Sequence, residues 1–137
     1  MMDVLTHQPL HPDMVRDAVS DDAHGALLVF EGVVRNHFEG RAVIGLEYEA
    51  YPEMVEPFLE ALKAEVQEKW PGTEIAVIHR LGRLEVGDTS LLLAASASHR
   101  AEVYAASSHA LEAIKAGLPV WKKEILADGS HWKPNAG

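Results

Sequence analysis

The chain has 137 residues, of which 47% are hydrophobic and 24% are charged, and this composition predicts one domain with a buried core. It contains no cysteine, which excludes disulfides, thiolate metal sites and a protein thiol nucleophile, so any sulfur chemistry must use sulfur supplied from outside. The formal net charge of −9 argues against nucleic-acid binding through the general surface, because such binding depends on clustered Lys and Arg.

The hydrophobic and charge pattern of the sequence shows no membrane-spanning or secretion signal. No stretch approaches the roughly 20 uninterrupted apolar residues that a membrane helix needs. The first residues also lack the basic-then-apolar layout of a signal peptide. We therefore expect no membrane association and a cytoplasmic location.

The first part of the chain carries His, Pro and Asp with little periodicity. Residues 1–23 are therefore predicted to pack loosely, with a short helix over residues 14–19. Residues 26–34 are apolar and β-prone. Residues 42–51 alternate between apolar and charged side chains, as expected for a strand with one solvent-exposed face. A turn at residues 38–40 would join these two strands into an antiparallel hairpin.

A long helix is the clearest feature of the middle of the chain. From Pro52 onward, apolar residues recur at helical spacing until Pro71 and Gly72 stop them. Strands are then predicted over residues 73–80, 83–86 and 89–97, separated by turns that contain glycine.

A second helix is predicted over residues 99–115, with Ser98 as its N-cap. A short segment at 120–124 and a tail over 125–137 follow it. Hairpins between helices indicate an α+β fold on a mainly antiparallel sheet with two principal helices. No repeat or linker divides the chain, so all 137 residues are assigned to one domain.

Local basic clusters in this acidic chain suggest a site for a small anion. Arg35 follows an apolar strand, where its guanidinium could bind phosphate in a bidentate manner, although a solvated surface arginine is the ordinary alternative. His99 and Arg100 lie at an expected helix start, which favours anions, and simple solvation is again the alternative. Only His7 and His11 have helical ligand spacing, and we predict no metal site.

The segment around Trp121 is more distinctive. Its tryptophan stands beside Lys122 and Lys123 after a proline, so it could hold a flat ring while a lysine acts on that ring; alternatively, it anchors the tail. Lys115 and Lys122 could serve as proton donors, charge stabilisers or amine nucleophiles, and the sequence leaves these roles open. For His79 with Arg80, a structural ion pair is the favoured interpretation.

The spacing of the basic residues bears on assembly. On one helix, His99 and Lys115 would be about 24 Å apart at about 1.5 Å per residue, too far to line one small pocket. If they share a site, the simplest arrangement is a dimer in which His99 and Arg100 of one subunit meet Arg35, Lys115 and Lys122 of the other.

Five ordered segments resemble motifs of the molybdopterin synthase large, catalytic subunit family. They are residues 30–37 (FEGVVRNH), 46–51 (LEYEAY), 78–82 (IHRLG), 98–100 (SHR) and 119–124 (PVWKKE). The resemblance covers roughly residues 25–132. Any one motif would be weak, but the five in this order are specific.

The resemblance implies an α/β hammerhead fold and a central homodimer, with a small ubiquitin-like sulfur carrier at each end of a heterotetramer. In that family the carrier's C-terminal Gly-Gly thiocarboxylate donates sulfur twice to cyclic pyranopterin monophosphate, which forms the dithiolene of molybdopterin. The partner brings the sulfur, so the resemblance implies no cofactor.

The same motif match implies roles for individual residues. Lys115 and Lys122 would be the principal catalytic lysines, while Arg35, His99 and Arg100 would hold the pterin phosphate and developing negative charge. Four further residues would complete the pocket: Val33, Val34, Lys123 and Glu124. Two alternatives stay open, another phosphate-binding small-molecule enzyme and a noncatalytic adaptor for a ubiquitin-like partner. An adaptor should tolerate loss of both lysines and still bind its partner.

Overall fold

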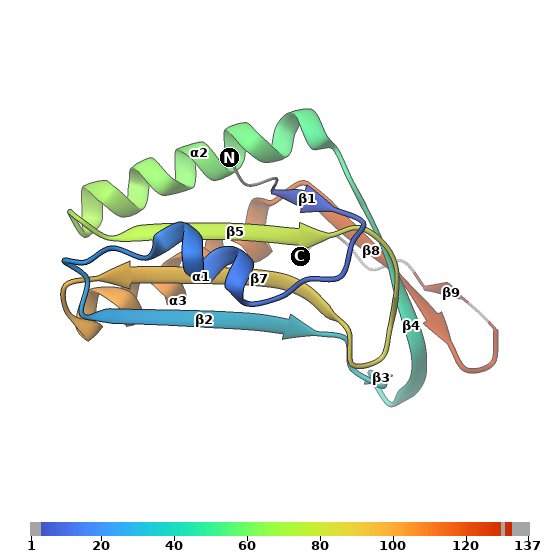
Figure 1. Cartoon of the computed structure of the whole chain (residues 1–137). Coiled ribbons are helices and arrows are strands. Elements are labelled where there is room, and N and C mark those ends of the chain that lie inside the picture. Colours follow the sequence, from blue (N-terminus) through green and yellow to red (C-terminus); the bar gives the residue numbers. More distant parts are fainter. Residues whose placement is uncertain (1–3, 130, 133–137) are drawn as a thin grey trace.

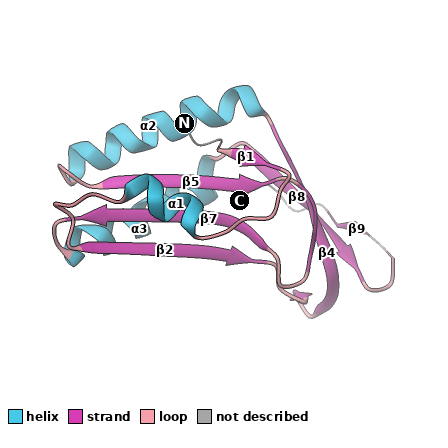
Figure 2. Cartoon of the chain, in the orientation of Figure 1, coloured by secondary structure: helices cyan, strands magenta, loops and turns pink. Residues whose placement is uncertain are grey.

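Two β-sheets and three helices make up residues 4–129 and 131–132, which are the residues that a computed structural model of the chain describes (Figures 1 and 2). The helices are α1 (Asp13–Val19), α2 (Pro52–Lys69) and α3 (Arg100–Gly117). Within these described residues, no helix is long and apolar enough to span a membrane.

The first sheet has four strands in the order β1-β5-β7-β2. Its strands are β1 (Leu5–Thr6), β5 (Glu74–Arg80), β7 (Thr89–Ala97) and β2 (Ala26–Val33). The pairings of β5 with β7 and of β7 with β2 are antiparallel, whereas β1 runs parallel to β5.

The second sheet has five strands, with β3, β4, β8 and β9 in order, and β6 pairs with β4 on the edge opposite β8. Its strands are β3 (His37–Phe38), β4 (Arg41–Ala50), β6 (Gly82–Glu85), β8 (Val120–Leu126) and β9 (His131–Trp132). All of its pairings are antiparallel, and the register sets Tyr48 opposite Lys122.

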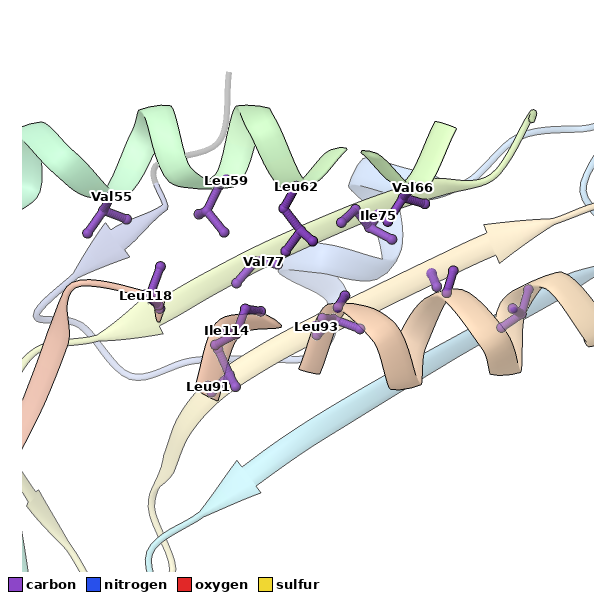
Figure 3. Close-up of a cluster of buried hydrophobic side chains, with 14 of the residues drawn as sticks. Val55, Leu59, Leu62, Val66, Ile75, Val77, Leu91, Leu93, Ile114 and Leu118 are labelled. Atoms are coloured by element: carbon purple, nitrogen blue, oxygen red, sulfur yellow. The ribbon is translucent and has the colours of Figure 1, made fainter. Parts of the chain in front are cut away.

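The main core lies between the first sheet and the two long helices. Leu91 and Leu93 of β7 face α2 and α3, together with Val77 of β5, as the labelled side chains in Figure 3 show. Leu92 and Ala94 point to the opposite face, which α1 covers. Because both faces of β7 are buried, its sequence is almost continuously apolar instead of alternating.

The predicted loose packing of residues 1–23 is wrong for the part that the structure describes. Val15 is 0% exposed and Val19 is 2% exposed, and both pack with Leu10 against the first sheet. β1 also pairs with β5. This packing was hard to predict because α1 spans only seven residues and presents only two fully buried side chains. Residues 1–3 lie outside the described residues.

The predicted hairpin between residues 26–34 and 42–51 is also wrong. β2 pairs with β7 along its length, and the turn at residues 38–40 joins β4 only to the two-residue strand β3. β4 belongs to the second sheet, where Val43 and Leu46 pack with Leu84 in a separate small core. Alternation within a strand shows which face is buried but does not identify the neighbouring strand.

The other predicted elements agree with the structure, apart from details at their ends. Both long helices and the strands over residues 73–97 begin and end within a few residues of their predicted bounds. Ser98 does not cap α3: the N-cap residue is His99, and the Ser98 hydroxyl donates to the Ala23 carbonyl at 3.5 Å. Ile125 and Leu126 are buried in β8 and do not belong to a tail, and residues 133–137 lie outside the described residues. The predicted α+β class with a mainly antiparallel sheet is confirmed.

Candidate active site

A cleft of about 310 Å³ is lined by residues of both sheets and of the C-terminal end of α3. Its side chains come from β2, β4, β5, β7 and β8 as well as from that helix, so distant parts of the sequence meet there. The lining residues are Phe30, Gly32, Val33, Arg35, Tyr48, His79, Ser90, Leu91, Ile114, Lys115, Leu118, Val120, Trp121 and Lys122.

Three cationic side chains reach this cleft from three separate segments. Arg35 follows β2, where Val34 is held by backbone hydrogen bonds to Asp88 and Gly87 at 2.9 Å each. Lys115 lies in the last turn of α3, where a positive charge complements the helix dipole. Lys122 lies on β8. Positive charge gathered in an otherwise acidic protein favours an anionic ligand.

Lys122 has a buried partner two residues further along β8. Its Nζ lies 3.7 Å from Oε1 of Glu124, which is 3% exposed. The other carboxylate oxygen, Oε2, is buried and has no hydrogen bond within the described residues. Burial raises the pKa of Glu124, while Lys122 and Arg35 act against that rise. Glu124 lines an adjoining cavity of about 80 Å³ that shares Val33, Arg35, Tyr48 and Lys122 with the cleft.

Tyr48 and His79 form an aromatic wall of the cleft. Their ring centroids lie 4.7 Å apart in an edge-to-face arrangement. The His79 Nδ1 atom is 2.8 Å from the Arg80 carbonyl oxygen, and burial lowers the pKa of His79 to about 4. Burial also raises the pKa of Tyr48, with a hydrogen bond to Ser90 acting in the other direction.

These wall residues were not selected from the sequence as site residues. The predicted ion pair at His79 and Arg80 is confirmed for Arg80, whose Nη1 atom lies 3.6 Å from Oδ2 of Asp88. His79 takes no part in that pair and lines the cleft instead. Two signals in the sequence pointed to His79: its place in the motif at residues 78–82, and the apolar strand before it, in which a histidine is unusual.

Trp121 is anchored by side-chain contacts and also lines the cleft. Its Nε1 atom donates to Oε2 of Glu49 at 3.1 Å, and its ring centroid lies 4.9 Å from that of Tyr51. These contacts fix the start of β8 to the end of β4 and the N-cap of α2. The ring also lines the cleft, so a planar ligand would meet an immobilised aromatic surface.

The structure brings together only some of the predicted site residues. Val33, Arg35, Lys115 and Lys122 line the cleft, while Val34 and Glu124 line the adjoining cavity. Lys123 lines neither of them.

His99 and Arg100 are exposed at the N-terminal end of α3, whereas the cleft lies at its C-terminal end. A single chain therefore does not bring them to the cleft. No group of three or more His, Asp or Glu side chains in the described ranges is arranged to hold a metal ion.

The fold and the cleft define an α+β protein with a cleft that carries three cationic side chains, is bordered by immobilised aromatic rings and contains no thiol. The model of the MoaE protein family matches residues 5–117 of the chain. The molybdopterin synthase catalytic subunit of Staphylococcus epidermidis is 43% identical over 126 residues, which cover 92% of this chain and 84% of that relative.

Solved structures agree with this match. The crystal structure of molybdopterin synthase from Staphylococcus aureus gives a TM-score of 0.93 at 36% identity and covers 98% of both chains. A complex of subunits 1 and 2 of molybdopterin-converting factor from Helicobacter pylori shares the fold, with a TM-score of 0.70 at 21% identity over 82% of this chain and 73% of that one. The chain belongs to the MoaE family, the catalytic subunits of molybdopterin synthase, and it is an enzyme of molybdenum cofactor biosynthesis.

Proposed function

We propose that the chain transfers sulfur from the thiocarboxylate of a small carrier protein to cyclic pyranopterin monophosphate, forming the dithiolene of molybdopterin. The main support is the convergence of Arg35, Lys115 and Lys122 on one cleft, in a chain that has no cysteine of its own. A dithiolene contains two sulfur atoms, so two carrier molecules are consumed for each product. The sulfur arrives with the partner, and the proposed reaction needs no cofactor.

The carrier is proposed to be a ubiquitin-like subunit whose C-terminal Gly-Gly segment enters the cleft. The Helicobacter pylori complex of two subunits supports this kind of partner. Glycine residues suit such an entry because they let a chain end pass between side chains without steric conflict. The encounter is proposed to take place in the cytoplasm.

Different roles are proposed for Arg35 and for the two lysines. Arg35 is suited to the substrate phosphate, since a guanidinium binds phosphate in a bidentate manner. Lys115 and Lys122 are proposed to stabilise the negative charge that develops when the thiocarboxylate sulfur bonds to a carbon of the substrate and water then cleaves the resulting thioester, which leaves the carrier with a carboxylate. Glu124 pairs with Lys122 and holds its ammonium group near the junction of the two cavities.

His99 and Arg100 are proposed to enter the site of a second subunit in a homodimer. They stand at the N-terminal end of α3, whose free N–H groups and dipole favour an anion. Their distance from Lys115 on the same helix means that they serve the phosphate only from the partner chain. The resulting assembly has two composite sites and, with two carriers, is a heterotetramer.

The test is conversion of cyclic pyranopterin monophosphate by the purified chain with a thiocarboxylated carrier. Lys115→Ala and Lys122→Ala are each expected to lower turnover by about 100-fold or more, the scale for removing one group that stabilises a developing anion. Lys69→Ala, at the end of α2, is the matched control and is expected to keep full turnover.

The outcomes separate the proposed reaction from its alternatives. Both lysine variants should still bind the carrier, as measured by titration calorimetry. A wild-type chain that binds a verified carrier but forms no product would favour the noncatalytic adaptor. Product formation that survives loss of both lysines would remove their proposed roles.

A further inference from the structure

His79 is held in the wall of the cleft by its own backbone. It lies near the end of β5, between β1 and β7, and its N–H donates to the Val4 carbonyl at 2.9 Å. The residue is 7% exposed and lines the cleft. Strand pairing on both sides therefore fixes the position of the backbone from which the imidazole extends.

The contact at Nδ1 determines the chemical character of the other ring nitrogen. A carbonyl oxygen only accepts hydrogen bonds, so the 2.8 Å contact with the Arg80 carbonyl requires that Nδ1 carry the proton. In a neutral imidazole, Nε2 then carries a lone pair and is a hydrogen-bond acceptor. Because burial lowers the pKa of His79 to about 4, the ring is neutral at physiological pH. No hydrogen bond found among the described residues involves Nε2.

The imidazole is also fixed in orientation. The edge-to-face contact with Tyr48 sets the two ring planes at 64°. Tyr48 is itself tied to Ser90, whose hydroxyl donates to the Gly32 carbonyl at 3.2 Å. An acceptor that is already oriented loses little entropy when a ligand binds it.

The charged groups of the cleft have the opposite hydrogen-bonding character. Arg35, Lys115 and Lys122 offer only donors, which suits the phosphate of a substrate. A pterin ring carries N–H groups, and these need an acceptor when they are removed from water. His79 lines the same cleft, and its Nε2 atom is an acceptor there.

We propose that His79 recognises the ring of the pterin substrate, by accepting a hydrogen bond at Nε2 from a ring N–H, and so separates a pterin from other organic phosphates. This inference rests on the proposed function and adds to it a residue that selects the substrate. A site that must pair a buried polar group discriminates strongly against ligands that leave the group unpaired.

The experiment compares two ligands, cyclic pyranopterin monophosphate and inorganic phosphate, by titration calorimetry. His79→Asn keeps an amide N–H near the Arg80 carbonyl but removes the acceptor at Nε2. We expect it to weaken pterin binding by about tenfold, as for the loss of one hydrogen bond, and to change phosphate binding less than about twofold. His79→Gln places an amide oxygen near the position of Nε2 and is expected to recover most of the pterin affinity.

Two other variants serve as controls. Arg35→Ala should weaken both ligands, because the phosphate is common to them. His109→Asn should change neither, since His109 lies on α3 and contacts Glu65 of α2 at 2.6 Å. Thermal unfolding of each variant shows whether it is folded at the temperature of the titration.

If folded His79→Asn lost affinity equally for both ligands, His79 would have a structural role and the inference would be overturned. Unchanged pterin affinity in His79→Asn would overturn it as well. A wild-type chain that binds phosphate but not the pterin would contradict both the proposed function and this inference. That result can be told apart from a failure of the inference alone, because it is obtained with the wild type before any His79 variant is made.

Discussion

Two ionisable side chains next to the cleft, His79 and Glu124, are buried. Burial disfavours the charged form of each, so it lowers the pKa of the imidazole and raises that of the carboxyl. The nearby cations oppose the effect at Glu124, which therefore remains a partner for Lys122. For His79, desolvation outweighs the opposing effect of the backbone hydrogen bond to Arg80, so the imidazole is neutral at neutral pH.

The shifted pKa of His79 predicts a pH-dependent stability. The folded value of about 4 lies below the unfolded value of 6.5, so the stabilising contribution is complete above pH 6.5 and is lost as the pH falls toward 4. Between pH 7 and pH 5, the wild-type free energy of unfolding should fall by about 2 kcal/mol more than that of His79→Gln, which does not titrate. Urea unfolding at both pH values measures the difference. Parallel curves for the two proteins would show that His79 is not buried as a neutral group.

Part of the candidate site could be predicted from the sequence, residue by residue. Arg35, Lys115 and Lys122 could be selected from residue type, local position and motif, because a cation near a predicted strand or helix end is visible in a sequence. The role of His79 could not, since it depends on a contact with the Arg80 carbonyl and on burial by strands distant in the chain. The position of Lys123 outside both cavities also could not be predicted from the sequence, because it depends on how β8 meets the rest of the fold.

At the scale of elements, the long apolar patterns of α2, α3, β5 and β7 identified these four elements, and the flanking turns that contain glycine identified the short strand β6. Periodicity failed for strand partners, because β2 and β4 are adjacent in sequence yet belong to different sheets. It also missed the docking of α1, whose two fully buried side chains are too few to form a pattern.

The docking of α1 gives a prediction for that element. Val15→Ala removes two methyl groups from a site that is 0% exposed, and it should cost about 2 kcal/mol. Hydrogen exchange of the amides of α1 should accelerate more than that of β7. Asp17→Ala, on the exposed side of the same helix, is the matched control and should change stability by less than about 0.5 kcal/mol. Equal effects of the two variants would mean that α1 does not pack as described.

At the scale of the whole molecule, an overall charge of −9 coexists with a cleft that carries three cations. The acidic surface repels stray anions in general, while the cleft collects them locally. His99 and Arg100, at the opposite end of α3, add two more basic groups only if a second subunit presents them.

The proposed composite site predicts recovery of activity when inactive chains are mixed. Arg100→Ala and Lys115→Ala dimers should each be inactive, but a mixed dimer has one site that contains neither change. After random exchange of subunits, turnover should reach about a quarter of the wild-type value. Mixing Lys115→Ala with Lys122→Ala is the control and should restore nothing, because both residues belong to the same cleft. Failure of the first mixture to recover would place the whole site within one chain.

The pairing of β4 with β8 has a consequence for synthesis of the protein. The register that sets Tyr48 opposite Lys122 joins two strands that are far apart in the chain, so β4 is synthesised well before β8. Until β8 leaves the ribosome, one edge of β4 is unpaired and the cleft lacks a wall. Long-range pairing of this kind forms late in folding and leaves open strand edges exposed to aggregation in the meantime. The nascent chain therefore has no binding site, and substrate and carrier meet only a finished molecule.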